Sequence, residues 1–148
     1  MGTPVDLLPP VGDRAAGLGT RMLLIVNPAS SNSDRERERA VVRELERAFE
    51  LEVVHTDGPG HATELSREAG RSGGEIVAVL GGDGAVNEAA NGLAGTDVPL
   101  APLPAGRTNV FCRLLGVPDD PPRAAAALSE LVARHADARP GEPAPARR

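Results

Sequence analysis

The chain has 148 residues, enough for one domain with its own hydrophobic core. Its formal net charge of −5 argues against a nucleic-acid partner and against a polybasic membrane anchor. The single cysteine, Cys112, excludes an internal disulfide and a cysteine metal cluster and suits a reducing cytoplasm. No stretch has the length and apolarity of a membrane span, so we expect a cytoplasmic protein.

The two ends of the chain differ in composition from its middle. Residues 1–20 contain prolines and glycines without a hydrophobic period, and residues 137–148 are rich in proline and arginine. Such segments bury little apolar surface, so we predict a flexible tail at each end. Residues 21–136 are then predicted to form a single domain.

The first element of that domain is the all-apolar run Met22–Val26, which predicts a strand buried on both faces. Asn27 and Pro28 end the strand in a turn that continues through Ser30 and Ser31. The amides and hydroxyls of this turn can meet a nucleotide at the strand end. An ordinary connection between a strand and a helix is the alternative interpretation.

A charged helix is predicted next. Ser33 with Glu36 matches a capping box, which predicts a helix start near Asp34. The apolar stripe of this helix consists of Val41, Val42, Leu45, Ala48 and Phe49. We interpret the charge run over residues 34–39 as a solvated face and not as a binding patch.

A second unit of strand, turn and helix follows. Leu51–His55 predicts a short strand, the segment beginning at Thr56 a turn, and His61–Ser72 a helix. We interpret His61, at the helix start, as a polar residue of the cap region and not as a catalyst. His55 and His135 have no partners at a metal-ligand spacing, so they predict no metal site.

The stretch around which the chain is organised lies in its middle. Ile76–Leu80 predicts a buried strand and Ala85–Leu93 a helix, so the residues between them form a tight turn. The first N–H groups of such a helix lack partners and the helix dipole is positive there, which favours an anion. Glycines also let a phosphate approach closely. The residues predicted to hold a nucleotide phosphate are Gly81, Gly82, Asp83, Gly84, Ala85, Asn87 and Glu88.

An acidic residue within an anion-binding turn calls for a reason. Asp83 fits if a divalent metal or a ribose hydroxyl lies there too, and Asn87 and Glu88 can point back to the same place. A glycine-rich turn without a ligand is the alternative. A Walker phosphate loop does not fit, because the chain contains no lysine. A dinucleotide fingerprint would need a third glycine where Asn87 stands.

Pro99–Leu103 predicts a fourth strand, although its two prolines suit an interior strand only at its ends. The polar turn after it contributes Gly106, Arg107, Thr108 and Asn109 to the predicted site. Arg107 can supply positive charge to a phosphate or can be a surface arginine.

Two helices are predicted to complete the domain. The first is Val110–Leu115, closed by Gly116, and the second is Pro121–Ala136. Phe111 and Leu114 are predicted to lie in the core, because both side chains are large and apolar.

Strands that alternate with helices predict an α/β fold, a Rossmann-like parallel sheet with helices on both faces. Ligands of such sheets bind at the carboxyl ends of the strands. The polar turns after Val26, Leu80 and Leu103 all follow strands, so the topology predicts that they meet at one crevice.

Three of these turns resemble motifs of the diacylglycerol kinase catalytic-domain family, which includes sphingosine kinases and bacterial lipid kinases and is related to NAD kinases. Gly81–Ala85 resembles the Gly-Gly-Asp-Gly-Thr signature, with Ala85 in place of the threonine. Asn27–Ser31 resembles an Asn-Pro-x-Ser-Gly turn, with Ser31 in place of the glycine. Thr56 with His61 resembles a further segment in which the threonine contacts the nucleotide.

The polar turn after Leu103 and the helix after it resemble the run Pro-x-Gly-Thr-x-Asn-x-Phe-Ala-Arg-x-x-Gly of the same family. The residues that keep its spacing are Gly106, Asn109, Phe111, Arg113 and Gly116. Arg107 replaces the threonine of the run and Cys112 replaces the alanine. The three motifs occur in the family's order between Met22 and Gly116.

The resemblance implies ATP and Mg²⁺ as cofactors and a diacylglycerol-like lipid hydroxyl as phosphate acceptor, met at a membrane surface. It implies that Asp83 helps to bind magnesium or the nucleotide, while the general base belongs to a β-rich second domain. The chain is therefore expected to be the nucleotide-binding half of a lipid kinase, completed by a second domain or subunit. Peripheral membrane association is the alternative to a purely cytoplasmic location.

Two other functions stay open. The losses at Ala85 and Arg107, both at threonine positions of the family, fit a non-catalytic nucleotide-binding remnant. An NAD-kinase-like protein would share the Gly-Gly-Asp-Gly turn, but the block of Asn109, Phe111 and Arg113 favours the lipid kinases.

Overall fold

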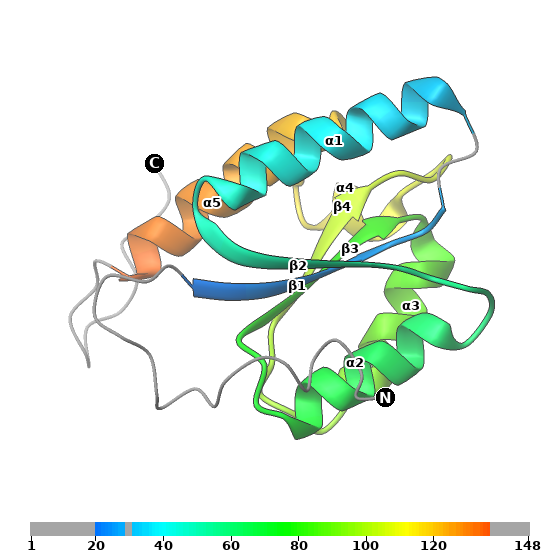
Figure 1. Cartoon of the computed structure of the whole chain (residues 1–148), viewed down its shortest axis with the longest axis vertical. Helices are drawn as coiled ribbons and strands as arrows, with labels where there is room; N and C mark the ends of the chain where they lie inside the picture. Colours follow the sequence, from blue (N-terminus) through cyan, green and yellow to red (C-terminus); the bar gives the residue numbers. More distant parts are fainter. Residues whose placement is uncertain (1–19, 29–30, 137–148) are drawn as a thin grey trace.

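The computed structural model describes residues 20–28 and 31–136. Its elements are β1 (Thr20–Val26), α1 (Asn32–Glu46), β2 (Phe49–His55), α2 (His61–Arg71), β3 (Ile76–Gly81), α3 (Asp83–Leu93), β4 (Leu100–Pro104), α4 (Val110–Leu114) and α5 (Pro121–Ala136). The strands form one parallel sheet in the order β2-β1-β3-β4 (Figure 1). The predicted α/β fold with a parallel sheet is confirmed.

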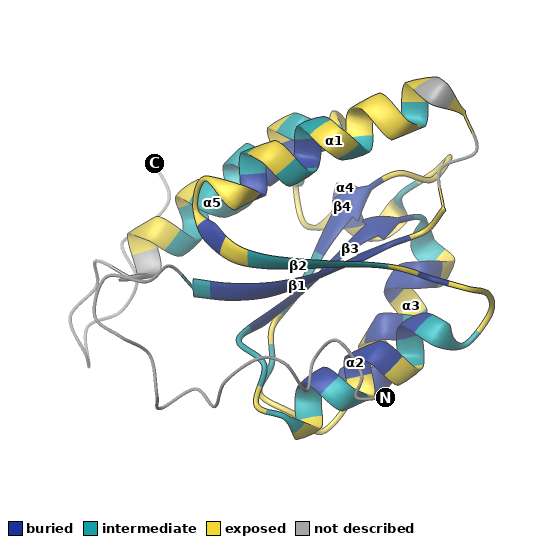
Figure 2. Ribbon diagram, in the orientation of Figure 1, coloured by how far each residue is buried: buried dark blue, intermediate teal, exposed yellow. Residues whose placement is uncertain are grey.

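Helices cover both faces of this sheet, because alternate strand residues point to opposite sides. Along β1, Leu23 and Ile25 pack in a cluster with α2 and α3, whereas Met22, Leu24 and Val26 pack in a second cluster with α1 and α5. The central strands are therefore buried along their length, as Figure 2 shows in dark blue. Within the described residues, no helix is long and apolar enough to cross a membrane.

On the first face, α2 and α3 approach each other closely. A Cβ added at Gly92 would lie 2.4 Å from the carbonyl oxygen of Thr63 and 2.7 Å from the Cβ of Ser66. The Thr63 hydroxyl also donates a hydrogen bond to the Glu88 carbonyl oxygen, 2.9 Å away. Small residues thus allow the two helices to seal this face.

Two details of α1 differ from prediction. The cap is Ser31 and not Ser33, because Ser31 stands where the chain leaves the turn and its Oγ accepts the Asp34 amide at 3.1 Å. Phe49 does not extend the helical stripe, since the helix ends at Glu46 and Phe49 opens β2 with its side chain in the core.

The predicted end tails fall mostly outside the described residues. Residues 1–19 and 137–148 lie there, as does Ser30 of the first polar turn. Thr20, which was assigned to the N-terminal tail, is instead the first residue of β1 and pairs with Phe49.

β4 is an edge strand, which explains why it tolerates proline. The Val77 amide donates to the Pro99 carbonyl and the Ala105 amide donates to the Gly81 carbonyl, so odd-numbered residues bond to β3. Pro102 and Pro104 therefore turn their nitrogen atoms to the outer edge, where no sheet hydrogen bond is lost.

α4 does not pack as predicted. Phe111 and Leu114 are exposed, and Cys112 is the residue of this short helix that is buried. The prediction of core positions was wrong here because a five-residue helix at the sheet margin can cover only one of its faces.

Candidate functional site

The loops that follow the four parallel strands lie together at the carboxyl ends of the strands, and hydrogen bonds join neighbouring loops. The Thr56 amide donates to the Val26 carbonyl oxygen at 2.9 Å, and the Asn27 amide donates to the Leu80 carbonyl oxygen at 3.2 Å. The Ala105 amide donates to the Gly81 carbonyl oxygen at 3.1 Å. The convergence that the topology predicts is therefore present in the structure.

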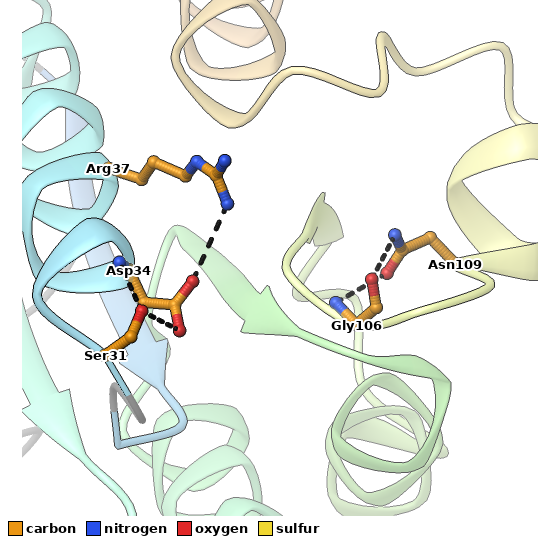
Figure 3. Close-up of polar contacts among 5 residues, drawn as sticks. All are labelled: Ser31, Asp34, Arg37, Gly106 and Asn109. Atoms are coloured by element: carbon orange, nitrogen blue, oxygen red, sulfur yellow. Dashed lines mark hydrogen bonds and ion pairs between the residues drawn. The ribbon is translucent and has the colours of Figure 1, made fainter.

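A pocket of about 340 Å³ opens at these strand ends, between α1 and the loops after β1 and β4. The lining residues are Val26, Asn27, Pro28, Asp34, Arg37, Glu38, Leu80, Pro104, Ala105, Gly106, Asn109, Asp119, Asp120 and Pro121. Of the predicted site residues, it brings together Asn27, Pro28, Gly106 and Asn109. Figure 3 shows Arg37 on the α1 side and Asn109 on the other.

Sequence reasoning missed the charged residues of this pocket. Asp34, Arg37 and Glu38 line it, so part of the run interpreted as a solvated face borders the crevice. The Arg37 Nη1 lies 3.6 Å from the Asp34 Oδ1 (Figure 3). Helical spacing of three and four residues was the available signal, because it puts these three side chains on one face.

The balance of charge around the pocket is acidic. One arginine, Arg37, stands against Asp34, Glu38, Asp119 and Asp120. A polyphosphate would be repelled by these carboxylates unless a divalent cation accompanied it. The described part of the chain holds no group of three or more His, Cys, Asp or Glu side chains arranged to bind a metal. A cation here would depend on ligand phosphates for much of its coordination, as Mg²⁺ commonly does.

Most of the glycines in the turns after β3 and β4 are explained by contacts within the chain itself. A Cβ at Gly81 would lie 3.0 Å from the Cβ of Ala85 and 3.0 Å from the Asn27 Nδ2. A Cβ at Gly106 would lie 2.6 Å from the Cα of Gly82. Gly84 is different, because a Cβ there would meet nothing within 4 Å. Gly84 therefore borders open space at the start of α3.

Asn109 closes the turn after β4. Its Oδ1 accepts the Gly106 amide at 2.9 Å, and its Nδ2 donates to the Gly106 carbonyl oxygen at 2.9 Å (Figure 3). Its backbone is left-handed, with φ 47°, a conformation that asparagine adopts more readily than most residues. The side-chain amide thus fixes the turn that lines the pocket.

Asp83 connects the glycine-containing turns after β3 and β4. Its Oδ2 accepts the Thr108 hydroxyl at 3.0 Å and its Oδ1 accepts the Phe111 amide at 3.2 Å. Hydrogen bonding from the Val110 backbone amide is the main cause that lowers the pKa of the Asp83 carboxyl, with the Phe111 amide, the Thr108 hydroxyl and the Arg113 charge adding to it and burial opposing it. The carboxylate is therefore held charged.

The remaining predicted residues do not line this pocket. The Thr56 hydroxyl donates to the Asn27 Oδ1 at 3.0 Å, and both residues line a second pocket of about 260 Å³. Glu88 lines that pocket too, with its carboxylate accepting the Gly60 amide. Asn87 and Arg107 are exposed and do not line either pocket.

A crevice bounded by polar loops at the carboxyl ends of parallel strands defines a class, the α/β domains that bind ligands at a sheet edge. Within that class, the model of the family "Diacylglycerol kinase catalytic domain" matches residues 21–139. The chain belongs to the diacylglycerol kinase catalytic-domain family, and the predicted family is confirmed.

Individual relatives agree with this assignment. The chain is 36% identical over 122 residues to a diacylglycerol kinase of Bacillus subtilis, covering 79% of this chain and 40% of that one. It is 37% identical over 118 residues to a probable lipid kinase, YegS-like, of Chromohalobacter salexigens, covering 77% of this chain and 38% of that one. A crystal structure of a diacylglycerol kinase from Bacillus anthracis superposes with a TM-score of 0.68 at 37% identity, covering 74% of this chain and 39% of that one. The chain thus spans about two fifths of the length of these relatives.

Proposed function

We propose that this chain is the nucleotide-binding part of a lipid kinase that transfers the γ-phosphoryl group of ATP to a lipid hydroxyl. The family membership supports the reaction class. The observation that carries the nucleotide site is that the turns at Asn27 and Gly106 line one pocket at the strand ends, and that Gly82 packs against Gly106 beside it.

In this proposal the nucleotide phosphates lie at the start of α3. The first amides of α3 have no partners within the helix and no side-chain cap at Gly82, and Gly84 leaves room for a phosphate to come close. Asn27 and Arg37, which line the neighbouring pocket, supply a polar and a cationic side chain. Mg²⁺ would neutralise the phosphates, which the acidic rim of the pocket otherwise repels.

The role proposed for Asp83 is positional. Both of its carboxylate oxygens already accept hydrogen bonds from the loop after β4 and from α4. It therefore holds the turn after β4 against the turn after β3, and each oxygen keeps a further lone pair that a metal or the nucleotide can meet. This role adds to the one that the family resemblance implies, which is help in binding magnesium or the nucleotide.

Transfer itself needs a part that these residues do not supply. The bond between the γ-phosphorus and the bridging oxygen breaks, a bond from phosphorus to the lipid oxygen forms, and the hydroxyl proton must pass to a base. We propose that a second domain or subunit provides this base and orients the lipid. The greater length of the relatives supports it, since the chain spans only 40% of the Bacillus subtilis protein.

Binding of a fluorescent ATP analogue to the isolated chain tests the nucleotide site. The expected result is saturable binding with magnesium that weakens when magnesium is chelated. Asn27→Ala should weaken binding, because Asn27 lines both pockets. The matched control is Asn91→Ala, on an exposed position near the other end of α3. No binding in the presence of magnesium would refute the proposal.

A non-catalytic remnant is the second candidate, favoured by Ala85 and Arg107 at threonine positions of the family's motifs. Ala85 is buried against Gly81 and offers no hydroxyl to the phosphate turn. An assay of the isolated chain with ATP and diacylglycerol separates the two. Turnover that is lost in Asp83→Ala would refute the remnant.

A further inference from the structure

Glu88 joins the two helices that cover the first face of the sheet. It belongs to α3, and its carboxylate accepts a hydrogen bond from the amide of Gly60, the residue that precedes α2. Its backbone carbonyl oxygen accepts the Thr63 hydroxyl at 2.9 Å. Figure 1 shows α2 and α3 side by side on this face. Glu88 thus holds the start of α2 through its side chain and through its backbone.

The start of α2 lacks a side-chain cap of its own. Gly60 is the N-cap residue, with a left-handed backbone at φ 85°, and no side chain of the helix bonds to it. In a capping box the third helical residue is Glu or Gln, and its side chain accepts the N-cap amide. The third residue of α2 is Thr63, so Glu88 makes this bond from α3 instead. A carboxylate is also favoured here because the helix dipole is positive at this end.

Hydrogen bonds within residues 57–61 make the loop before α2 one unit with the helix start. The Asp57 amide donates to the His61 Nδ1 at 2.9 Å, and the His61 amide donates to the Gly58 carbonyl oxygen at 3.2 Å. At its other end the loop is bonded to the turn after β1. The contact made by Glu88 therefore sets where this unit stands relative to α3.

The same loop forms a wall of the second pocket. This pocket of about 260 Å³ is lined by residues 56–59, by Asn27 and Pro28, and by Glu88. Asn27 and Pro28 line the larger pocket of the crevice too, so the two pockets share a border. A shift of the loop relative to α3 would change the width of the second pocket.

A negative charge beside a polyphosphate needs compensation. Glu88 and Asp57 both line the second pocket, and none of the described residues that line it carries a positive charge. A carboxylate in direct contact with a nucleotide phosphate would repel it. A carboxylate that caps α2 is partly compensated by the helix dipole. The bond to Gly60 therefore gives Glu88 a role that does not need contact with the nucleotide.

We propose that Glu88 is a positioning residue for the nucleotide. By capping α2 it fixes the loop after β2 against α3, and the fixed loop gives the second pocket its shape. This inference rests on the proposed function, since it concerns the same site. It differs from the sequence-based prediction, in which Glu88 itself meets the phosphate. A residue that acts through Gly60 needs an acceptor oxygen at the right reach, whereas a ligand of a phosphate-bound metal ion needs the negative charge as well.

Three substitutions of Glu88 in the full chain separate reach from charge. Glu88→Gln keeps the length and an acceptor oxygen, Glu88→Asp keeps the charge on a shorter side chain, and Glu88→Ala removes both. With magnesium present, Glu88→Gln should bind a fluorescent ATP analogue within about twofold of wild type. Glu88→Asp and Glu88→Ala should bind it about fivefold more weakly, as one lost hydrogen bond implies.

Hydrogen exchange at the Gly60 amide reports the contact without nucleotide. Exchange should be at least about fivefold faster in Glu88→Asp and Glu88→Ala than in wild type and Glu88→Gln. The control is Thr63→Val, which removes the bond to the Glu88 carbonyl oxygen and keeps the carboxylate contact. It should lower stability without changing nucleotide affinity or exchange at Gly60. Thermal unfolding of each variant checks that it is folded.

The proposal requires nucleotide affinity to follow exchange at Gly60 through the whole series. A Glu88 variant that binds weakly while its Gly60 amide stays protected would overturn it, because the charge of Glu88 would then act directly. A variant with fast exchange and wild-type affinity would overturn it equally. Weaker binding by Thr63→Val would overturn it as well, since any loosening of α2 on α3 would then suffice.

These results leave the proposed function standing, because the wild-type chain binds nucleotide in all of them. A wild-type chain that does not bind the ATP analogue with magnesium refutes the proposed function and this inference with it. The affinity of the wild-type chain therefore tells the two failures apart.

Discussion

On the α2–α3 side of the sheet, the apolar residues Leu65, Val86 and Leu93 are at most 6% exposed, whereas Leu114 on α4 is 78% exposed. The first side is sealed because small residues let two long helices touch, with Gly92 of α3 against the backbone of α2. The second side carries a short helix beside an edge strand, with an apolar groove left open between β4 and α5. The comparison indicates that the α2–α3 pair serves stability, whereas α4 leaves apolar side chains open to solvent.

The largest effect is expected at Gly92. Gly92→Val should lower the free energy of unfolding by about 3 kcal/mol, because its Cβ would meet the Thr63 carbonyl at 2.4 Å and the Arg67 amide nitrogen at 2.9 Å, and backbone atoms cannot move aside cheaply. Chemical denaturation measures this.

The control for Gly92 is Gly84→Ala, in the same helix, where an added Cβ has open space. It should leave stability unchanged or raise it by up to about 1 kcal/mol. If Gly92→Val were tolerated as well as Gly84→Ala, the close packing of α2 on α3 would be refuted.

A smaller loss is expected at Gly106, where the two polar turns meet. Gly106→Ala should cost about 2 kcal/mol and weaken ATP-analogue binding, because its Cβ would lie 2.6 Å from the Gly82 Cα and push the turns apart. Asn91→Ala, on an exposed position of α3, serves as the control. Equal binding by both variants would count against a shared crevice.

The next effect depends on pH. The folded-state pKa of Asp83 is lowered from the ordinary 3.8, so its ionised form stabilises the fold above that pH, and the contribution is lost as the pH falls through the lowered pKa. Asp83→Asn should therefore be less stable than wild type at neutral pH and converge with it in acid. Denaturation across the pH range measures the difference, with the exposed Asp97→Asn as control. A constant gap down to the acid limit would contradict the proposed charge-dependent contacts.

The smallest effect on stability is expected on α4. Leu114→Ser should change the free energy of unfolding by less than about 0.5 kcal/mol, because the side chain is mostly in solvent. Leu45→Ala, at a fully buried position of α1, should cost about 3 kcal/mol by comparison. A large loss in Leu114→Ser would show that α4 is structural and would blur the contrast between the two sides.

The strands and the longer helices were predictable because their signals are local. The apolar run 76–80 and the glycines after it identify β3 and the start of α3 without knowledge of neighbours. Parallel alternation then implied that Asn27, Gly82 and Gly106 share an edge.

The contacts that depend on tertiary structure were not predictable. The residues next to Asp83 in the sequence do not indicate its hydrogen bonds to Thr108 and Phe111, which lie 25 and 28 positions away. The exposure of Leu114 likewise depends on which element stands opposite it, and the sequence of α4 alone favours burial. Arg37 was interpreted as part of a solvated face because the sequence of α1 does not show what lies beside the helix. The sheet brings Arg37 and Asn109 to the same pocket.

The central claim, that a nucleotide enters the crevice where the three polar turns meet, is tested most directly by amide chemical shifts of the isolated chain during titration with ATP and magnesium. The account predicts shifts concentrated at Asn27, at residues 82–85 and at residues 105–109, with α2 beyond its first turn unaffected. Shifts gathered on α2, spread evenly over the chain, or absent at saturating nucleotide would contradict it.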